Sequence, residues 1–81
     1  MKNTTIYDNG GKTLDRITVI FNDRKRVTKD GVLYECTTAS ENGSGFYQHS
    51  EAMKGRHLGK KIDFIKLSLP LQNKLLIELN N

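Results

Sequence analysis

The 81-residue sequence contains a single cysteine, Cys36, and no apolar run long enough to cross a bilayer. One thiol cannot close an internal disulfide, and a lone cysteine suits a reducing compartment. The first residues lack the basic and apolar segments of a signal peptide. These absences exclude a disulfide-stapled secreted scaffold and a helical membrane protein. They predict a cytoplasmic protein without a membrane partner.

The sequence also lacks the patterns by which enzymes are recognised. It has no Ser/His/Asp spacing, no paired carboxylates and no nucleotide-binding fingerprint, and its glycines are too sparse for a phosphate loop. A nucleophilic pair of Cys36 with a histidine is one alternative. That cysteine, however, stands in the middle of an expected strand, where a buried structural thiol is the more frequent case. We therefore predict a protein that is not an enzyme.

Metal-ligand spacing is missing as well. His49, Glu51, His57 and Cys36 are the available ligands, but the two histidines are eight positions apart and no close ligand pair accompanies them. The alternative is that each histidine hydrogen-bonds the backbone of an irregular loop, whose amides and carbonyls need partners. We predict no metal and no cofactor.

Composition is that of a small globular protein, with 36% hydrophobic and 27% charged residues. A chain of this length forms one domain, residues 1–81, and we expect residues 1–5 to be frayed. The formal net charge is +4. A basic surplus favours a nucleic-acid or acidic partner, although such a charge also serves solubility alone.

Alternation of apolar and polar residues predicts an antiparallel hairpin after a short extended piece at Ile6–Tyr7 and a turn at residues 8–11. Its strands are residues 14–22 and 32–38, joined by a connection at residues 22–31 that either loops out or extends the first strand past a bulge. In the first strand, Ile17, Val19 and Phe21 should face the core. The opposite face, with Arg16, Thr18 and Ile20, should be largely wet.

The sequence of the second half of the chain predicts one more strand and a helix. Residues 58–65 alternate as a third strand, whereas residues 46–54 fit either a short helix or an ordered loop. Ser68 is a candidate N-cap, Pro70 suits a first helical turn, and Leu71, Leu75 and Leu79 form an apolar stripe. The fold class is therefore α+β, a small antiparallel sheet of about three strands with an irregular Gly-rich loop and a C-terminal helix packed on the sheet.

Four stretches of this sequence resemble a family of small proteins from phages and bacterial mobile elements. They are YDNGGKTLDR at residues 7–16, GFYQH at 45–49, GRHLGKKI at 55–62 and the Leu69-Pro70 pair that opens the helix. The resemblance covers most of the chain from Tyr7 onward, and departs from the family at residues 23–30, which are expanded and basic. It implies a phage or mobile-element origin and no catalytic residues.

Two basic stretches are the candidate binding surfaces. The central segment, residues 43–61, combines both histidines with four of the seven glycines, and we expect Phe46 within it to fill a gap in the core. The second stretch is the basic connection of the hairpin. The candidate binding residues are Tyr47, Gln48, His49, Lys54, Arg56, His57, Lys60 and Lys61 in the central segment, and Arg24, Lys25 and Arg26 in the hairpin.

These observations predict a non-catalytic accessory protein that binds and inhibits a host macromolecule, such as a defence complex, in the manner of an anti-CRISPR protein. Its partner would be a host protein or a protein–nucleic-acid complex in the host cytoplasm. The alternative is direct binding of RNA, DNA or a nucleotide by the basic Gly-rich loop. A third interpretation is a structural domain that forms a homo-oligomer through a sheet edge.

Overall fold

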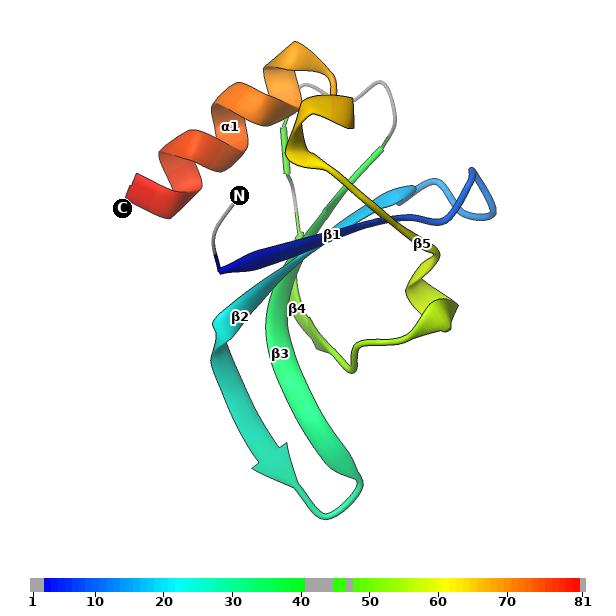
Figure 1. The fold of residues 1–81 in the computed structure, drawn as a ribbon, viewed down its shortest axis with the longest axis vertical. Coiled ribbons are helices and arrows are strands. Elements are labelled where there is room, and N and C mark those ends of the chain that lie inside the picture. Colours follow the sequence, from blue (N-terminus) through cyan, green and yellow to red (C-terminus); the bar gives the residue numbers. More distant parts are fainter. Residues whose placement is uncertain (1–2, 41–44, 47, 81) are drawn as a thin grey trace.

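A computed structural model describes residues 3–40, 45–46 and 48–80 of the chain. Its strands are β1 (Thr4–Asp8), β2 (Ile17–Thr28), β3 (Gly31–Ala39), β4 (Gln48–Ala52) and β5 (Lys60–Ile62). They form one antiparallel sheet in the order β4-β3-β2-β1-β5 (Figure 1). The α+β class is confirmed, but the expected count of about three strands is wrong, because the sheet has five. β1 begins at Thr4, inside the segment expected to fray.

Strand β2 is longer than its apolar alternation indicated. Its register with β3 steps from the Ile20–Cys36 pair to the Lys25–Tyr34 pair. Four residues of β2, 21–24, therefore lie between these pairs, where β3 has only Glu35. This bulge leaves a short stretch of β2 outside the pairing ladder, and the two strands pair again up to Thr28 and Gly31. Residues 22–28 therefore belong to the strand and not to a looped connection. The β2–β3 hairpin extends away from the helix at one end of the molecule (Figure 1).

The face of the sheet that carries Val19 packs against the C-terminal helix, α1 (Leu69–Asn80). We call it the helix face. Val19 and Phe21 are fully buried there with Leu71 and Leu75, as the apolar stripe predicted. Phe46 and Leu79 pack against this cluster as partly buried side chains, which confirms the core role expected for Phe46.

The opposite face of the sheet, which we call the loop face, is also apolar. Ile20, Cys36 and Tyr7 form a second buried cluster, and Tyr34, Ala52 and Leu58 pack around it. The prediction of a largely wet face at Thr18 and Ile20 is wrong, because Leu58, from the connection between β4 and β5, packs over this side of the sheet. Ile20 is 0% exposed.

The segment that the sequence left open between helix and loop contains a strand, since residues 48–52 pair with β3. Residue 47 lies outside the described residues. The predicted third strand at residues 58–65 is shortened to β5, and it is flanked by two 3₁₀ turns, η1 (Arg56–Leu58) and η2 (Phe64–Lys66). β5 pairs with β1 and not with the neighbouring strand in sequence, so the chain crosses from one edge of the sheet to the other.

Helix α1 begins as predicted. The Leu71 N–H donates a hydrogen bond of 3.4 Å to the Ser68 hydroxyl, as an N-cap requires. Pro70 lies in the first turn, where its missing N–H costs no hydrogen bond. The described part of the chain contains no helix with the length and apolar content needed to span a bilayer.

Candidate functional site

The connection between β4 and β5, residues 53–59, carries two of the four predicted cations of the central segment, Lys54 and Arg56. Its second half is fixed by two backbone hydrogen bonds, in which Leu58 N–H donates to the Gly55 carbonyl (3.1 Å) and Gly59 N–H to that of Arg56 (3.0 Å). These bonds form the η1 turn, and the Leu58 side chain packs on the loop face of the sheet. The connection is therefore anchored to the second core cluster.

Three of the predicted cations line one depression on the loop face. Its volume is about 360 Å³. The cations come from the second residue after β4, from η1 and from β5, and the remaining lining is two glycines and one strand residue. The lining of this basic depression is Tyr7, Lys54, Gly55, Arg56, Gly59 and Lys61.

The positive charge of the basic depression is not compensated. None of Lys54, Arg56 and Lys61 forms an ion pair with a described residue, and all three side chains are exposed. The Lys54 ammonium lies 4.5 Å from the ring centroid of Tyr34, in a cation–π contact. The pKa of Tyr7 is raised by burial first and by neighbouring Tyr34 second, so its hydroxyl stays protonated.

Gly59 joins the basic depression to the first turn of the chain. It has a φ of +109°, and a Cβ atom there would overlap the carbonyl oxygen of Asp8 and lie 2.6 Å from the Cα of Asn9. Only glycine satisfies both the backbone conformation and the close approach. Two of the stretches that carry the family resemblance, residues 7–16 and 55–62, therefore meet at this residue.

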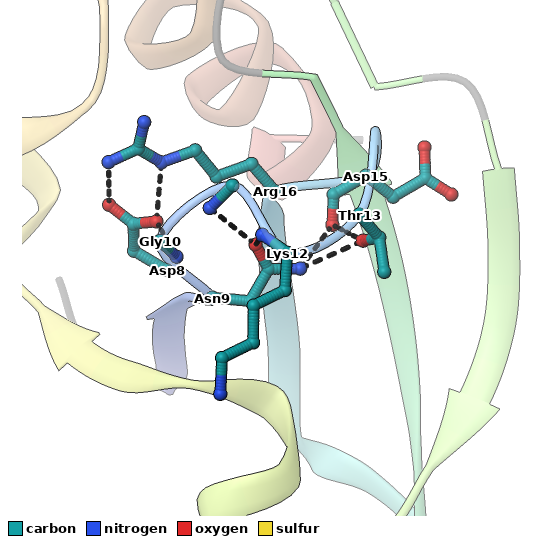
Figure 2. Close-up of polar contacts among 8 residues, drawn as sticks. Asp8, Asn9, Gly10, Lys12, Thr13, Asp15 and Arg16 are labelled. Carbon is teal, nitrogen blue, oxygen red and sulfur yellow. Dashed lines mark hydrogen bonds and ion pairs between the residues drawn. The ribbon is translucent and has the colours of Figure 1, made fainter.

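The first turn is held by a side-chain network that the sequence analysis did not anticipate (Figure 2). Arg16 donates to both carboxylate oxygens of Asp8, through Nε (2.6 Å) and Nη2 (3.1 Å). This ion pair, with a further bond from the Gly10 N–H, holds the pKa of Asp8 below its ordinary value, although partial burial raises it.

Asn9 organises the inside of the same turn. Its side-chain oxygen accepts hydrogen bonds from the Gly11 N–H (2.9 Å) and the Lys12 N–H (3.1 Å), and its amide donates to the Thr13 hydroxyl (2.8 Å) and the Asp15 carbonyl (3.2 Å). An asparagine side chain that bonds to the backbone two residues on is the usual device for such a turn. These hydrogen bonds account for Asp8, Asn9 and Arg16 of the YDNGGKTLDR pattern.

The two arginines of the β2–β3 hairpin differ from the cations of the basic depression, because acidic side chains of neighbouring strands meet them. Arg24 lies 3.2 Å from Glu35 on β3, and its guanidinium stands 4.5 Å from the Phe21 ring centroid. Arg26 binds both carboxylate oxygens of Glu51 on β4, at 2.7 and 2.9 Å. These four charged side chains line a shallow hollow with a volume of about 490 Å³. Because it carries both positive and negative side chains, we call it the mixed-charge surface.

The two histidines do not share a site. His49, on β4, places its Nε2 3.1 Å from Glu78 Oε1 of α1, so its partner is a side chain and not the loop backbone that the sequence suggested. His57 is exposed in η1. Among the residues that the structure describes, no three His, Cys, Asp or Glu side chains come together as metal ligands.

Cys36 is buried, as predicted for a structural thiol. It is 2% exposed, and its Sγ lies 3.3 Å from the Ser50 hydroxyl across the β3–β4 pair.

The structure brings together only part of the predicted binding set. Lys54, Arg56 and Lys61 share the basic depression, whereas Lys60 alternates onto the other side of β5, opposite Asp8. Arg24, Lys25, Arg26 and His49 line the mixed-charge surface. Gln48 begins β4, and Tyr47 lies outside the described residues.

Tyr7 is the one side chain of the lining that the sequence did not indicate, apart from the two glycines. The signal was available, since Tyr7 stands in the predicted extended piece with its side chain opposite to that of Ile6. What the sequence did not show is the pairing of Tyr7 with Lys61, which brings β1 beside β5.

Comparison with known proteins adds no relative: no family model, no curated protein and no solved structure matches this chain. The phage and mobile-element origin therefore stays a prediction from the sequence.

Proposed function

We propose that this protein is a non-catalytic accessory protein of a phage or mobile element, which binds a host macromolecule such as a defence complex and blocks it. The observation that carries the proposal is the basic depression. Lys54, Arg56 and Lys61 reach it from separate segments, and no acidic side chain of the described residues pairs with them. Charges that no internal partner compensates are available to a ligand and raise its rate of association.

The chemistry of the other reactive side chains supports binding more than catalysis. A nucleophilic cysteine needs an accessible thiolate and a base beside it. Cys36 is enclosed between strands against a serine hydroxyl, and His49 lies against a carboxylate of the helix. Neither arrangement supplies an activated nucleophile.

The test is affinity capture from host cells, with and without nuclease treatment, using the parent chain and an Arg56→Glu/Lys61→Glu variant. The parent should retain a host protein after nuclease treatment, and the variant should lose it, because charge reversal slows association and repels the same partner. The control is Lys29→Glu/Lys66→Glu, which makes the same change in net charge at exposed positions outside the depression.

Circular dichroism of each variant should first show an unchanged fold. Equal capture by the parent and the folded Arg56→Glu/Lys61→Glu variant would remove the basic depression from the proposal. Absence of any nuclease-resistant partner would overturn the proposal itself.

A second candidate function is direct binding of RNA, DNA or a nucleotide. The same three uncompensated cations favour it, because phosphate contacts of Lys and Arg dominate affinity for nucleic acids. In the capture experiment this function predicts recovery of nucleic acid that nuclease removes, with no host protein retained.

A further inference from the structure

The surroundings of the basic depression favour one kind of partner. The cores of protein–protein interfaces are apolar and depleted in lysine, whereas nucleic-acid interfaces are polar and strongly positive. The large apolar side chains exposed among the described residues are Leu14, Val27, Met53, Ile65, Leu69, Leu76 and Ile77, and none of them lines the depression. The apolar part of its lining belongs to the Tyr7 ring, the glycines and the methylene groups of the cations, so it offers charge and hydrogen bonding without an exposed aliphatic anchor.

The depression also holds a hydrogen-bond donor and open backbone. The Tyr7 hydroxyl has no hydrogen-bond partner among the described residues. It is not one of the enclosed polar atoms without a partner, which are hydroxyls of Thr4, Thr37 and Thr38, so it keeps contact with solvent. Gly55 and Gly59 contribute only backbone to the lining. Charged and neutral donors around one space suit the oxygens of phosphate groups.

The aromatic rings near the depression are already covered. Tyr7 is 3% exposed, and the Lys54 ammonium lies over the ring of Tyr34. Stacking of bases on aromatic side chains needs a free ring face. Within the described part of the chain, this surface can therefore contact a sugar–phosphate backbone but offers no aromatic platform for the bases.

We infer that the basic depression is a phosphate site, which holds neighbouring backbone phosphates of a nucleic-acid strand without reading its bases. The inference rests on the proposed function, in which this depression is the contact surface, and it names the nucleic-acid component of the host complex as what is touched there. Lys54, Arg56 and Lys61 neutralise the phosphates, and the Tyr7 hydroxyl donates to a phosphate oxygen.

The experiment is fluorescence anisotropy of a labelled oligothymidylate titrated with the full chain at several salt concentrations. Each phosphate contact to a single strand contributes about −0.7 to the slope of log K against log salt. Three contacts give a slope of about −2. Arg56→Gln should reduce its magnitude by about 0.7 and weaken binding about fivefold at 0.1 M salt. An oligonucleotide of mixed sequence should bind with the same affinity.

Matched controls separate the site from general attraction by a basic protein. Lys66→Gln and Lys74→Gln each remove one exposed positive charge outside the depression, and should leave the slope unchanged. Arg56→Lys keeps the charge and should keep most of the slope. Circular dichroism and the melting temperature of each variant show that the fold is intact.

Two results would overturn the inference: no binding of either oligonucleotide, whether or not ATP binds, or an equal loss of slope in the Lys66→Gln control. The inference and the proposed function can fail separately. A nuclease-resistant partner that depends on Arg56, without oligonucleotide binding, would refute only the inference. Oligonucleotide binding as described, without a nuclease-resistant host partner, would refute only the proposed function.

Discussion

Gly59 and Asp8 occupy the point where the connection between β4 and β5 passes closest to the first turn. The glycine provides a left-handed backbone conformation and an absent side chain, and the aspartate provides both a carbonyl that abuts the glycine and a carboxylate that binds Arg16. Two single residues thus set the distance between the first turn and the wall of the basic depression. Substitution of either residue should lower the free energy of unfolding more than it lowers the affinity for a ligand.

We expect Gly59→Ala to destabilise the fold by about 2 kcal/mol or more, because a left-handed alanine is strained and its Cβ would also meet backbone atoms. Gly10→Ala is the matched control. Its φ is also positive, at +77°, but the space around it is open, so the cost should be about 1 kcal/mol. Urea unfolding of both variants measures the difference. Equal losses at the two positions would contradict the close approach at Gly59.

The Asp8–Arg16 pair should make stability depend on pH in acid. The pKa of Asp8 is lowered in the folded state, chiefly by its hydrogen bonds from Arg16. Its contribution is therefore complete above the unfolded value of 3.8 and is lost as pH falls through the folded pKa. Asp8→Asn should cost about 1–2 kcal/mol at neutral pH. The gap between parent and variant should close below pH 3.8, as urea midpoints at several pH values will show; a gap that stays constant would refute this account.

β2 is the element on which both core clusters are built. It gives Ile17, Val19 and Phe21 to the helix face and Ile20 to the loop face, and beyond its bulge it continues into the projecting hairpin. A single strand therefore contributes to both buried clusters. Substitutions on its two faces should have similar effects.

Ile20→Ala should cost about 2–5 kcal/mol and Phe21→Ala about 3–5 kcal/mol, since both side chains are fully buried. Losses of this size approach the whole stability of a small domain. Thermal or urea unfolding measures both. If Ile20 lay on a wet face, as the alternation first indicated, its substitution would change stability by no more than about 0.5 kcal/mol.

Local signals predicted the elements that local interactions determine. The cap at Ser68, the proline in the first turn and the leucine spacing all lie within α1 itself, and the helix is where the sequence placed it. β4 is different. Its sequence, QHSEA, has no apolar alternation, and it becomes a strand only because β3 offers backbone partners. The wet-face prediction at Ile20 failed for the same reason, since Leu58 covers it from a distant segment.

The sequence likewise predicted only part of the candidate site. The sequence identified the cations of the depression, but not that Lys60 turns away from Lys61 or that Tyr7 lies beside them. It also could not show that Glu35 and Glu51 meet the hairpin arginines, because these acids lie on other strands.

At the scale of the whole molecule, two basic regions differ in whether acidic side chains neutralise their charge. The hairpin carries arginines whose charges are matched by nearby acids, whereas the basic depression on the loop face carries cations with no such partner among the described residues. The net charge of +4 is therefore a poor guide to where an anionic ligand would bind.

Replacing Arg24, Lys25 and Arg26 by serine should leave the melting temperature almost unchanged, because all three are exposed and surface ion pairs contribute little. Differential scanning calorimetry measures this directly. Host-partner capture should also persist, since the depression is untouched. A large fall in melting temperature would show that the hairpin ion pairs support the core, and loss of capture would make the hairpin part of the contact surface.

The pairing of β5 with β1 has a consequence for how the chain folds. It joins residues about 55 positions apart, such as Ile6 and Ile62, and the helix that covers Val19 and Phe21 follows later still. Local hairpins can form early, but the apolar helix face stays open until both late elements arrive. During synthesis the helix face of the first strands therefore stays exposed to solvent until β5 and α1 have been made. The folding rate should accordingly be limited by this long-range closure and not by the β2–β3 hairpin.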